Sequence, residues 1–457
     1  MNVLMEICAM LSRLALVVAA ALTLAGCATY QPKPLDIQAG PAHALAWASR
    51  PAGPSQPFSL EQIGQLAVQS NPDLIAARAE HGIAAAQLES AAALPNPVLS
   101  VSYAGVVSGA GALPAIALGL GQDIKALIIR PAKVGAAKAQ LAQVDAGILW
   151  QEWQVSAKAE LTALELAAAS RQLVLASETS RLWDEQLARS RVAMEQGDIS
   201  MTSFVKDSQR SADARQQTAL LTTLRLTKQQ DLAGLLGLAS EVEIPIAYPS
   251  PIATTDATLV TGRLEDIAAY RPDLIALRAG YESQEQKVRQ SVLAQFPAMT
   301  VGGNYGRDTG NVKTAGVDVS MEIPIFNHNQ AGISIEQATR AKLAAEFRAR
   351  LIFAKNELMS LIAQQGLAEK QRVQKAKQFA ADSALVPRLR AALARHDIDA
   401  LTYVEAVAAQ NGKEQELIAL ESSIAAQNLA IQTLSGLGMP HMDRLDGTTQ
   451  SPIGADQ

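Results

Sequence analysis

The sequence predicts a mainly α-helical chain that also carries four short β-strands, arranged in two tandem halves. Helix-forming residues (Ala, Leu, Gln, Glu, Lys, Arg) dominate from Ala132 to Ile244, a stretch without a single proline. Two shorter stretches, 98–124 and 298–326, alternate apolar with small or polar residues, which is typical of strands. Landmarks of the first half recur in the second at a nearly constant offset, which indicates a tandem repeat.

The N-terminus has the pattern of a targeting signal. Arg13 precedes the apolar run of residues 14–25, which is too short for the ~20 residues of a membrane-spanning helix. The run ends in Leu24-Ala25-Gly26-Cys27, which resembles the bacterial lipobox. We therefore expect a signal peptide at 1–26, a diacylated Cys27, and an extended tether over 27–57, which is rich in Pro, Ala and Gln. The alternative is an ordinary signal peptide with a chance cysteine.

The first half is predicted to span residues 58–244. Ser59 is expected to cap a first helix, and a β-hairpin is expected at about 98–124. A helical hairpin follows at about 131–237, broken where Gly197 can end one helix and Ser200 can cap the next. Its two pieces would be about 65 and about 35 residues long, and at 1.5 Å per residue the longer would extend about 95 Å.

The second half repeats this order. Arg271-Pro272-Asp273-Leu274 restates Asn71-Pro72-Asp73-Leu74, and the break at His396-Asp397-Ile398-Asp399 corresponds to Gly197-Asp198-Ile199-Ser200. Pro387 should kink the long helix in which we expect it to lie. The predicted divisions are a linker at 245–261, the second half at 262–438 with its β-hairpin at about 298–326 and its helical hairpin at about 327–436, and a tail at 439–457.

The alternating strands require an apolar environment on one side. The length of these strands matches that of a tilted transmembrane β-strand. An open sheet edge cannot lie in hydrocarbon, because its N–H and C=O groups would lack partners. Four strands are too few to close a barrel, so several chains must share one. Three chains would supply twelve strands, an even number that such barrels allow. We therefore predict a transmembrane barrel in contact with lipid that several copies of the chain share.

Composition excludes several classes of function. The net charge is −5 without a basic stripe, which argues against a nucleic-acid partner. No setting for a nucleophile and no phosphate-binding glycine loop is apparent, so we predict that the chain is not an enzyme and needs no cofactor. No metal site is expected, because the five histidines lack a second ligand at helical spacing. These are His43, His81, His328, His396 and His441.

Taken together, these motifs resemble the TolC family of outer-membrane efflux proteins. The signal with its lipobox, the duplicated halves, the Pro-Asp-Leu helix starts, the Ile323-Pro324-Ile325-Phe326 strand ending and the Gly197-Asp198-Ile199-Ser200 tip carry the resemblance. More narrowly, the sequence is similar to the lipidated members of the family that serve resistance-nodulation-division (RND) pumps. The resemblance implies a trimeric twelve-stranded barrel in the bacterial outer membrane and a long α-helical barrel in the periplasm. It also implies a periplasmic adaptor (membrane fusion) protein and an inner-membrane RND pump as partners.

The resemblance also implies where function is located. The two helical tips would contact the adaptor, although His396 stands where family members commonly have glycine, which leaves that turn's conformation open. The tip residues are Gly197, Asp198, Ile199, Ser200, His396, Asp397, Ile398 and Asp399.

A periplasmic gate is implied just beyond the tips. Many members place two acidic residues three apart there, and this chain has Thr402 and Glu405. The equivalent positions of the first half are Ser203 and Lys206. Three copies of Glu405 would attract cations at a narrow mouth. Alternatively, Glu405 lies on a solvated helix face or pairs with Lys206.

The sequence thus predicts an outer-membrane exit duct that passively conducts drugs, metal ions or other small toxic solutes. Two alternatives are the duct of a type I secretion system and a non-conducting, lipid-anchored periplasmic coiled-coil tether. The apolar strand face favours a duct, because a tether has no need of one.

Overall fold

The computed structural model describes residues 30–38, 40–42, 57–109, 113–249 and 254–439, which fall into two units, 1–41 and 42–457. The described residues of the first unit form neither helix nor strand. The predicted signal peptide, Cys27, and all of the tail after residue 439 lie outside the described residues, as do His43 and His441. All further description concerns the second unit.

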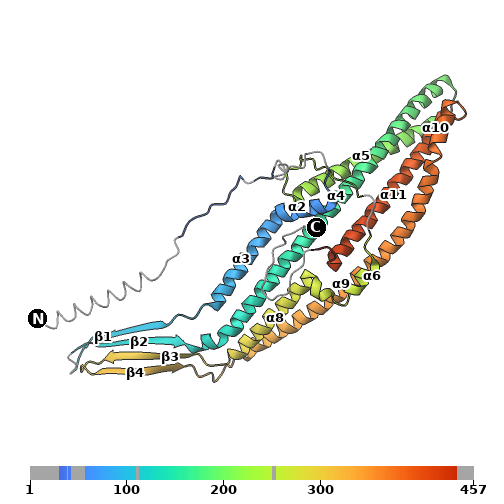
Figure 1. Ribbon diagram of the computed structural model, residues 1–457. Helices are drawn as coiled ribbons and strands as arrows, with labels where there is room; N and C mark the ends of the chain where they lie inside the picture. Colours follow the sequence, from blue (N-terminus) through green and yellow to red (C-terminus); the bar gives the residue numbers. More distant parts are fainter. Residues whose placement is uncertain (1–29, 39, 43–56, 110–112, 250–253, 440–457) are drawn as a thin grey trace, which may run out of the picture. The chain divides into compact units, whose positions relative to one another are not determined.

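A single antiparallel sheet of four strands contains both predicted β-hairpins (Figure 1). Its strands are β1 (Val98–Ala104), β2 (Ala115–Asp123), β3 (Met299–Arg307) and β4 (Lys313–Met321), in that order across the sheet. The pairing of β2 with β3 joins the two halves of the chain. The prediction of four strands in a mainly helical chain is therefore confirmed.

The register divides the side chains of the sheet into two contrasting faces. One, which we call the apolar face, carries Leu99, Val101 and Tyr103 beside Leu120, Leu118 and Ile116, and continues through Tyr305 and Val301 to Val317, Val319 and Met321. The other, the polar face, carries Ser100, Ser102, Ala117, Gly119, Gly121, Thr300, Asn304, Thr314, Asp318 and Ser320, with Val98 as its one large apolar residue. Most large side chains of the apolar face are exposed in the single chain.

The last strand is shorter than its sequence predicts. The alternation continues to Phe326, but β4 ends at Met321. Pro324 has no N–H to donate to a ladder, so pairing stops before it. Ile323, Ile325 and Phe326 are left outside the sheet and exposed.

The helices of the first half are α2 (Leu60–Ser70), α3 (Pro72–Ala92), α4 (Ile124–Gln196) and α5 (Met201–Leu235). Ser59 caps α2 as expected and forms a capping box with Gln62. Helix α4 has 73 residues and begins directly after β2, earlier than predicted, because Asp123 caps it by accepting a hydrogen bond of 3.0 Å from the Ala126 N–H. It continues through Pro131.

The second half contains α6 (Ala257–Arg263), α7 (Ile267–Tyr270), α8 (Pro272–Leu293), α9 (Gln330–Ser383), α10 (Val386–Ala394) and α11 (Ala400–Ser435). Helix α6 begins inside the predicted linker. The prediction of a kink at Pro387 is wrong: the helix is interrupted after Ser383, and Pro387 lies in the first turn of α10, where its missing N–H costs no hydrogen bond.

Helix α4 packs against helices of both halves of the chain. It contacts α2, α3 and α5 of its own half and α8 and α11 of the other. Alanines at its contact surfaces, among them Ala159 and Ala163, are fully buried, which permits close helix approach. Because α4 begins at the sheet and ends at the first tip, sheet and tips lie at its opposite ends (Figure 1). Among the described residues, none of the helices combines the length and the apolar composition needed to span a lipid bilayer.

Candidate functional site

The first tip is a tight turn between α4 and α5. Gly197 ends α4 in the left-handed conformation (φ 81°), and the Asp198 N–H donates to the Ala193 carbonyl over 2.8 Å. The Ser200 hydroxyl then accepts a hydrogen bond from the Ser203 N–H over 3.2 Å and caps α5. Glycine and serine occupy the two positions where their conformational and hydrogen-bonding properties are needed.

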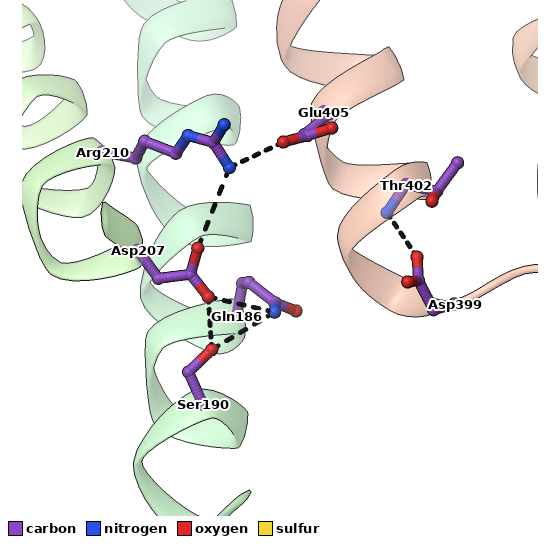
Figure 2. Close-up of polar contacts among 7 residues, drawn as sticks. All are labelled: Gln186, Ser190, Asp207, Arg210, Asp399, Thr402 and Glu405. Carbon is purple, nitrogen blue, oxygen red and sulfur yellow. Dashed lines mark hydrogen bonds and ion pairs between the residues drawn. The ribbon is translucent and has the colours of Figure 1, made fainter. Parts of the chain in front are cut away.

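The second tip has the same local geometry without the glycine. His396 adopts a left-handed conformation (φ 60°), and the Asp397 N–H donates to the Ala392 carbonyl over 2.9 Å. The Asp399 carboxylate caps α11 by accepting a hydrogen bond of 2.7 Å from the Thr402 N–H (Figure 2). Hydrogen bonds from Thr402 lower the pKa of Asp399. The sequence left the conformation of this turn open; the structure gives His396 the role of Gly197.

Behind the tips, Arg210 connects the two helical hairpins. Its guanidinium Nη1 lies 2.6 Å from Oε1 of Glu405 on α11 and 3.8 Å from Oδ1 of Asp207 on its own helix α5 (Figure 2). The same guanidinium lies over the ring of Trp183 on α4, 5.0 Å from its centroid. In the single chain Glu405 therefore pairs with Arg210 rather than with Lys206.

Asp207 of α5 is hydrogen-bonded to two residues of α4. Only 5% of its surface is exposed, and its Oδ2 accepts hydrogen bonds from the Ser190 hydroxyl and, over 3.4 Å, from Nε2 of Gln186 (Figure 2). These donors both lie on α4, so Asp207 ties α5 to α4 within the first hairpin. Arg210 then extends the network to the second hairpin.

Apolar packing joins the same helices. Leu182 and Trp183 of α4 form a buried cluster with Val404 and Val407 of α11. The two hairpins are thus held together near their tips by one apolar cluster and one ion pair.

An open pocket of about 500 Å³ lies between the two hairpins near their tips. Ile199, Ser203, Lys206, Asp399 and Glu405 line it, so the structure brings these predicted residues together. Thr402 serves instead as a backbone donor to Asp399. The residues that complete the lining are Gln186, Arg189, Ser190, Ala193, Asp207, Arg210, Ala400 and Leu401.

The charges that line the pocket balance. Arg189, Lys206 and Arg210 face Asp207, Asp399 and Glu405. Sequence reasoning missed Arg210 and Asp207, although a signal was present: they lie three residues apart, one helical turn beyond Ser203 and Lys206. The pocket of the single chain is therefore not strongly acidic.

No metal site is found in the described part of the chain, where no three His, Cys, Asp or Glu side chains are grouped to hold an ion. His81 instead contacts Asp145, with 2.6 Å between its Nδ1 and Oδ1.

No protein-family model and no curated protein matches this sequence. Solved structures do match it in fold. A membrane protein from Pseudomonas aeruginosa has a TM-score of 0.70 at 15% identity, covering 85% of this chain and 92% of its own. The outer-membrane channel OprN has a TM-score of 0.67 at 16% identity, covering 90% and 100%. The open state of the MtrE outer membrane channel of Neisseria gonorrhoeae has a TM-score of 0.67 at 16% identity, covering 83% and 89%.

The chain therefore has the fold of outer-membrane channels over most of its length. OprN and MtrE are outer-membrane channels.

Proposed function

We propose that this chain is the outer-membrane exit duct of a tripartite efflux system and conducts small toxic solutes passively out of the periplasm. The observation that carries the proposal is the contrast between the apolar and polar faces of the four-stranded sheet. A sheet with one exposed apolar face and one face of small and polar residues suits a wall between lipid and water.

Closure of that wall requires further copies of the chain. β1 and β4 are the edge strands of the sheet, and their unpaired N–H and C=O groups would be costly in hydrocarbon. Pairing β4 of one copy with β1 of the next removes every edge. Three copies give twelve strands, and the tandem repeat of hairpin and helices would give the assembly approximate sixfold regularity.

The helices would continue this wall into the periplasm as a helical barrel. Its closed end would lie at the tips, where Gly197, Asp198, Ile199, Ser200, His396, Asp397, Ile398 and Asp399 are proposed to contact a periplasmic adaptor protein. The gate would comprise Ser203, Lys206, Thr402 and Glu405, to which the structure adds Arg210 as the partner of Glu405. A lipid on Cys27 would anchor the chain, and an inner-membrane RND pump would supply the energy.

Two other functions were considered from the sequence, a non-conducting tether and a type I secretion duct. A coiled-coil tether does not account for the apolar face, whose Leu99, Val101 and Val317 are exposed in the single chain. A type I secretion duct would use the same barrel and tips, and only the partner proteins would differ. We favour the efflux pump because the sequence predicts a lipid on Cys27, and an N-terminal lipid is typical of the members that serve RND pumps.

The test compares two neighbouring residues on opposite faces of β1. Leu99→Arg places a charge in the middle of the proposed lipid-facing surface, at a cost of about 2–4 kcal/mol per copy. Ser100→Arg adds the same charge to the polar face. We expect Leu99→Arg to reduce the amount of assembled trimer in outer-membrane fractions and the channels seen in planar bilayers, and Ser100→Arg to assemble and conduct. The tether would be favoured if both substitutions were tolerated equally and if neither the wild type nor a variant with an opened tip conducted.

A further inference from the structure

The register places two cations side by side at the end of the sheet farthest from the helices. Arg307 is the last residue of β3, Lys313 the first of β4, and the two are paired directly across the strands. Both lie on the apolar face, in one row with Tyr103 of β1 and Ile116 of β2. Residues opposite each other in this way have Cβ atoms about 4.5–5.5 Å apart.

These cations have no acidic partner among the described residues. Like charges directly opposite on a sheet destabilise it. The nearest carboxylate in sequence, Asp308, is engaged in the turn, where its Oδ1 accepts hydrogen bonds from the Gly310 and Val312 N–H groups over 2.8 and 2.9 Å. Arg307 makes one long contact, 3.5 Å from Nη2 to the Pro114 carbonyl, and its Nε is buried without a partner. An external anion would relieve this repulsion.

The surroundings of this pair are those of a membrane interface. One row further from the turn, Tyr305 lies on the same face beside Leu118, and Tyr103 lies in the row of the cations themselves. Tyrosines flanking an apolar band are typical of the level of lipid headgroups. Helix α4 leaves the sheet at its opposite end, at Asp123, so a periplasmic helical part puts the Arg307–Lys313 end in the outer leaflet.

We propose that Arg307 and Lys313 bind the phosphate group of a phosphorylated glycolipid of the outer leaflet. The inference rests on the proposed function, because it requires the apolar face to contact lipid. A guanidinium binds phosphate through two parallel hydrogen bonds, and the neighbouring ammonium adds a point charge. The apolar rows below offer a surface for acyl chains, which a free phosphate ion would not use. Three copies in a trimer would hold three such lipids around the barrel.

The experiment is native mass spectrometry of the full-length protein in detergent, titrated with bisphosphorylated lipid A. Two comparison ligands are the same lipid after removal of its phosphates, and inorganic phosphate alone. The test variant is Arg307→Gln with Lys313→Gln. The matched control is Lys377→Gln with Arg388→Gln, which removes two exposed cations from α9 and α10, where neither has an ion-pair partner among the described residues.

We expect the test variant to bind bisphosphorylated lipid A about twenty-fivefold more weakly, because each of the two cations at an anionic surface contributes about fivefold. The control variant should bind as the wild type does, and dephosphorylated lipid should bind to the wild type as weakly as lipid A does to the test variant. Equal binding of lipid A by wild type and test variant would overturn the proposal, as would inorganic phosphate binding as tightly as the lipid.

The failure of this inference is distinguishable from failure of the proposed duct. A wild type that conducts in bilayers but does not discriminate between phosphorylated and dephosphorylated lipid loses only the lipid site. A chain that never enters a bilayer contradicts the duct, and the lipid site is overturned with it. Trimer content and circular dichroism of the test variant check that it has folded.

Discussion

Removal of the Arg210 guanidinium should open the periplasmic end of the proposed duct. In Arg210→Gln the ion pair with Glu405 is lost, and with it the only charged contact that joins the first hairpin to the second among the predicted gate residues. Asp207 lies on the same helix as Arg210, so that contact persists in closed and open states alike and cancels. What Arg210 contributes to the difference between the two states therefore reduces to its pair with Glu405.

The exposure of the two side chains sets the size of the effect. Arg210 and Glu405 are 41% and 46% exposed, so solvent screens the pair and its contribution is about 0.2–1 kcal/mol per chain. Three copies acting together would contribute about 0.6–3 kcal/mol, which is about a 3- to 150-fold change in the ratio of open to closed channels. The buried cluster of Leu182, Trp183, Val404 and Val407 remains, so we expect more frequent opening and not permanent opening.

Open probability in planar bilayers measures this change directly. The matched control is Arg215→Gln, also on α5, whose pair with Asp184 (2.9 Å) lies within the first hairpin and should not affect the gate. Arg210→Lys should retain most of the closure. Adding Glu405→Gln to Arg210→Gln should produce no further opening, because the pair is already broken. An Arg210→Gln channel that opens no more often than Arg215→Gln would refute the reasoning.

Two further predictions concern stability. His396→Gly should stabilise the folded chain by about 1 kcal/mol. The left-handed conformation costs a residue with a side chain about 1–2 kcal/mol, and the greater freedom of glycine in the unfolded chain offsets part of that gain. A lower midpoint of unfolding in denaturant would contradict the prediction. Burial on α4 raises the pKa of Glu160 to about 7, from an ordinary value of 4.5. A raised carboxyl pKa means that the folded state binds the proton more tightly than the unfolded state does. The stability gained from this proton is therefore fully present below pH about 4.5 and is lost as the pH rises through about 7. Glu160→Gln should therefore stabilise the folded chain more at pH 8 than at pH 5, by up to about 3 kcal/mol in the free energy of unfolding. The measurement is the melting temperature of the variant and the wild type at each pH, and an equal effect at both pH values would contradict the prediction.

The sequence determined the local structure of the chain. Alternation with period two defined the strands and their two faces, since successive side chains of a strand point to opposite sides. The caps at Ser59 and Ser200 and the end of α4 at Gly197 followed from the chemistry of those residues alone. Boundaries were less certain: helix α4 starts at Ile124 and β4 stops at Met321, because the Asp123 cap and Pro324 outweigh the longer pattern.

Tertiary structure decided which distant residues meet. The pairing of β2 with β3 joins segments about 180 residues apart, and no local pattern specifies it. The sequence left three environments open for Glu405, namely an acidic ring, a solvated helix face and a pair with Lys206, and the packing of the two hairpins placed it beside Arg210. The same holds for Arg307 and Lys313, whose proximity follows from the turn but whose place beside Tyr103 depends on pairing between the halves. Local patterns reflect backbone geometry within a few residues, whereas these contacts depend on how whole helices and strands pack.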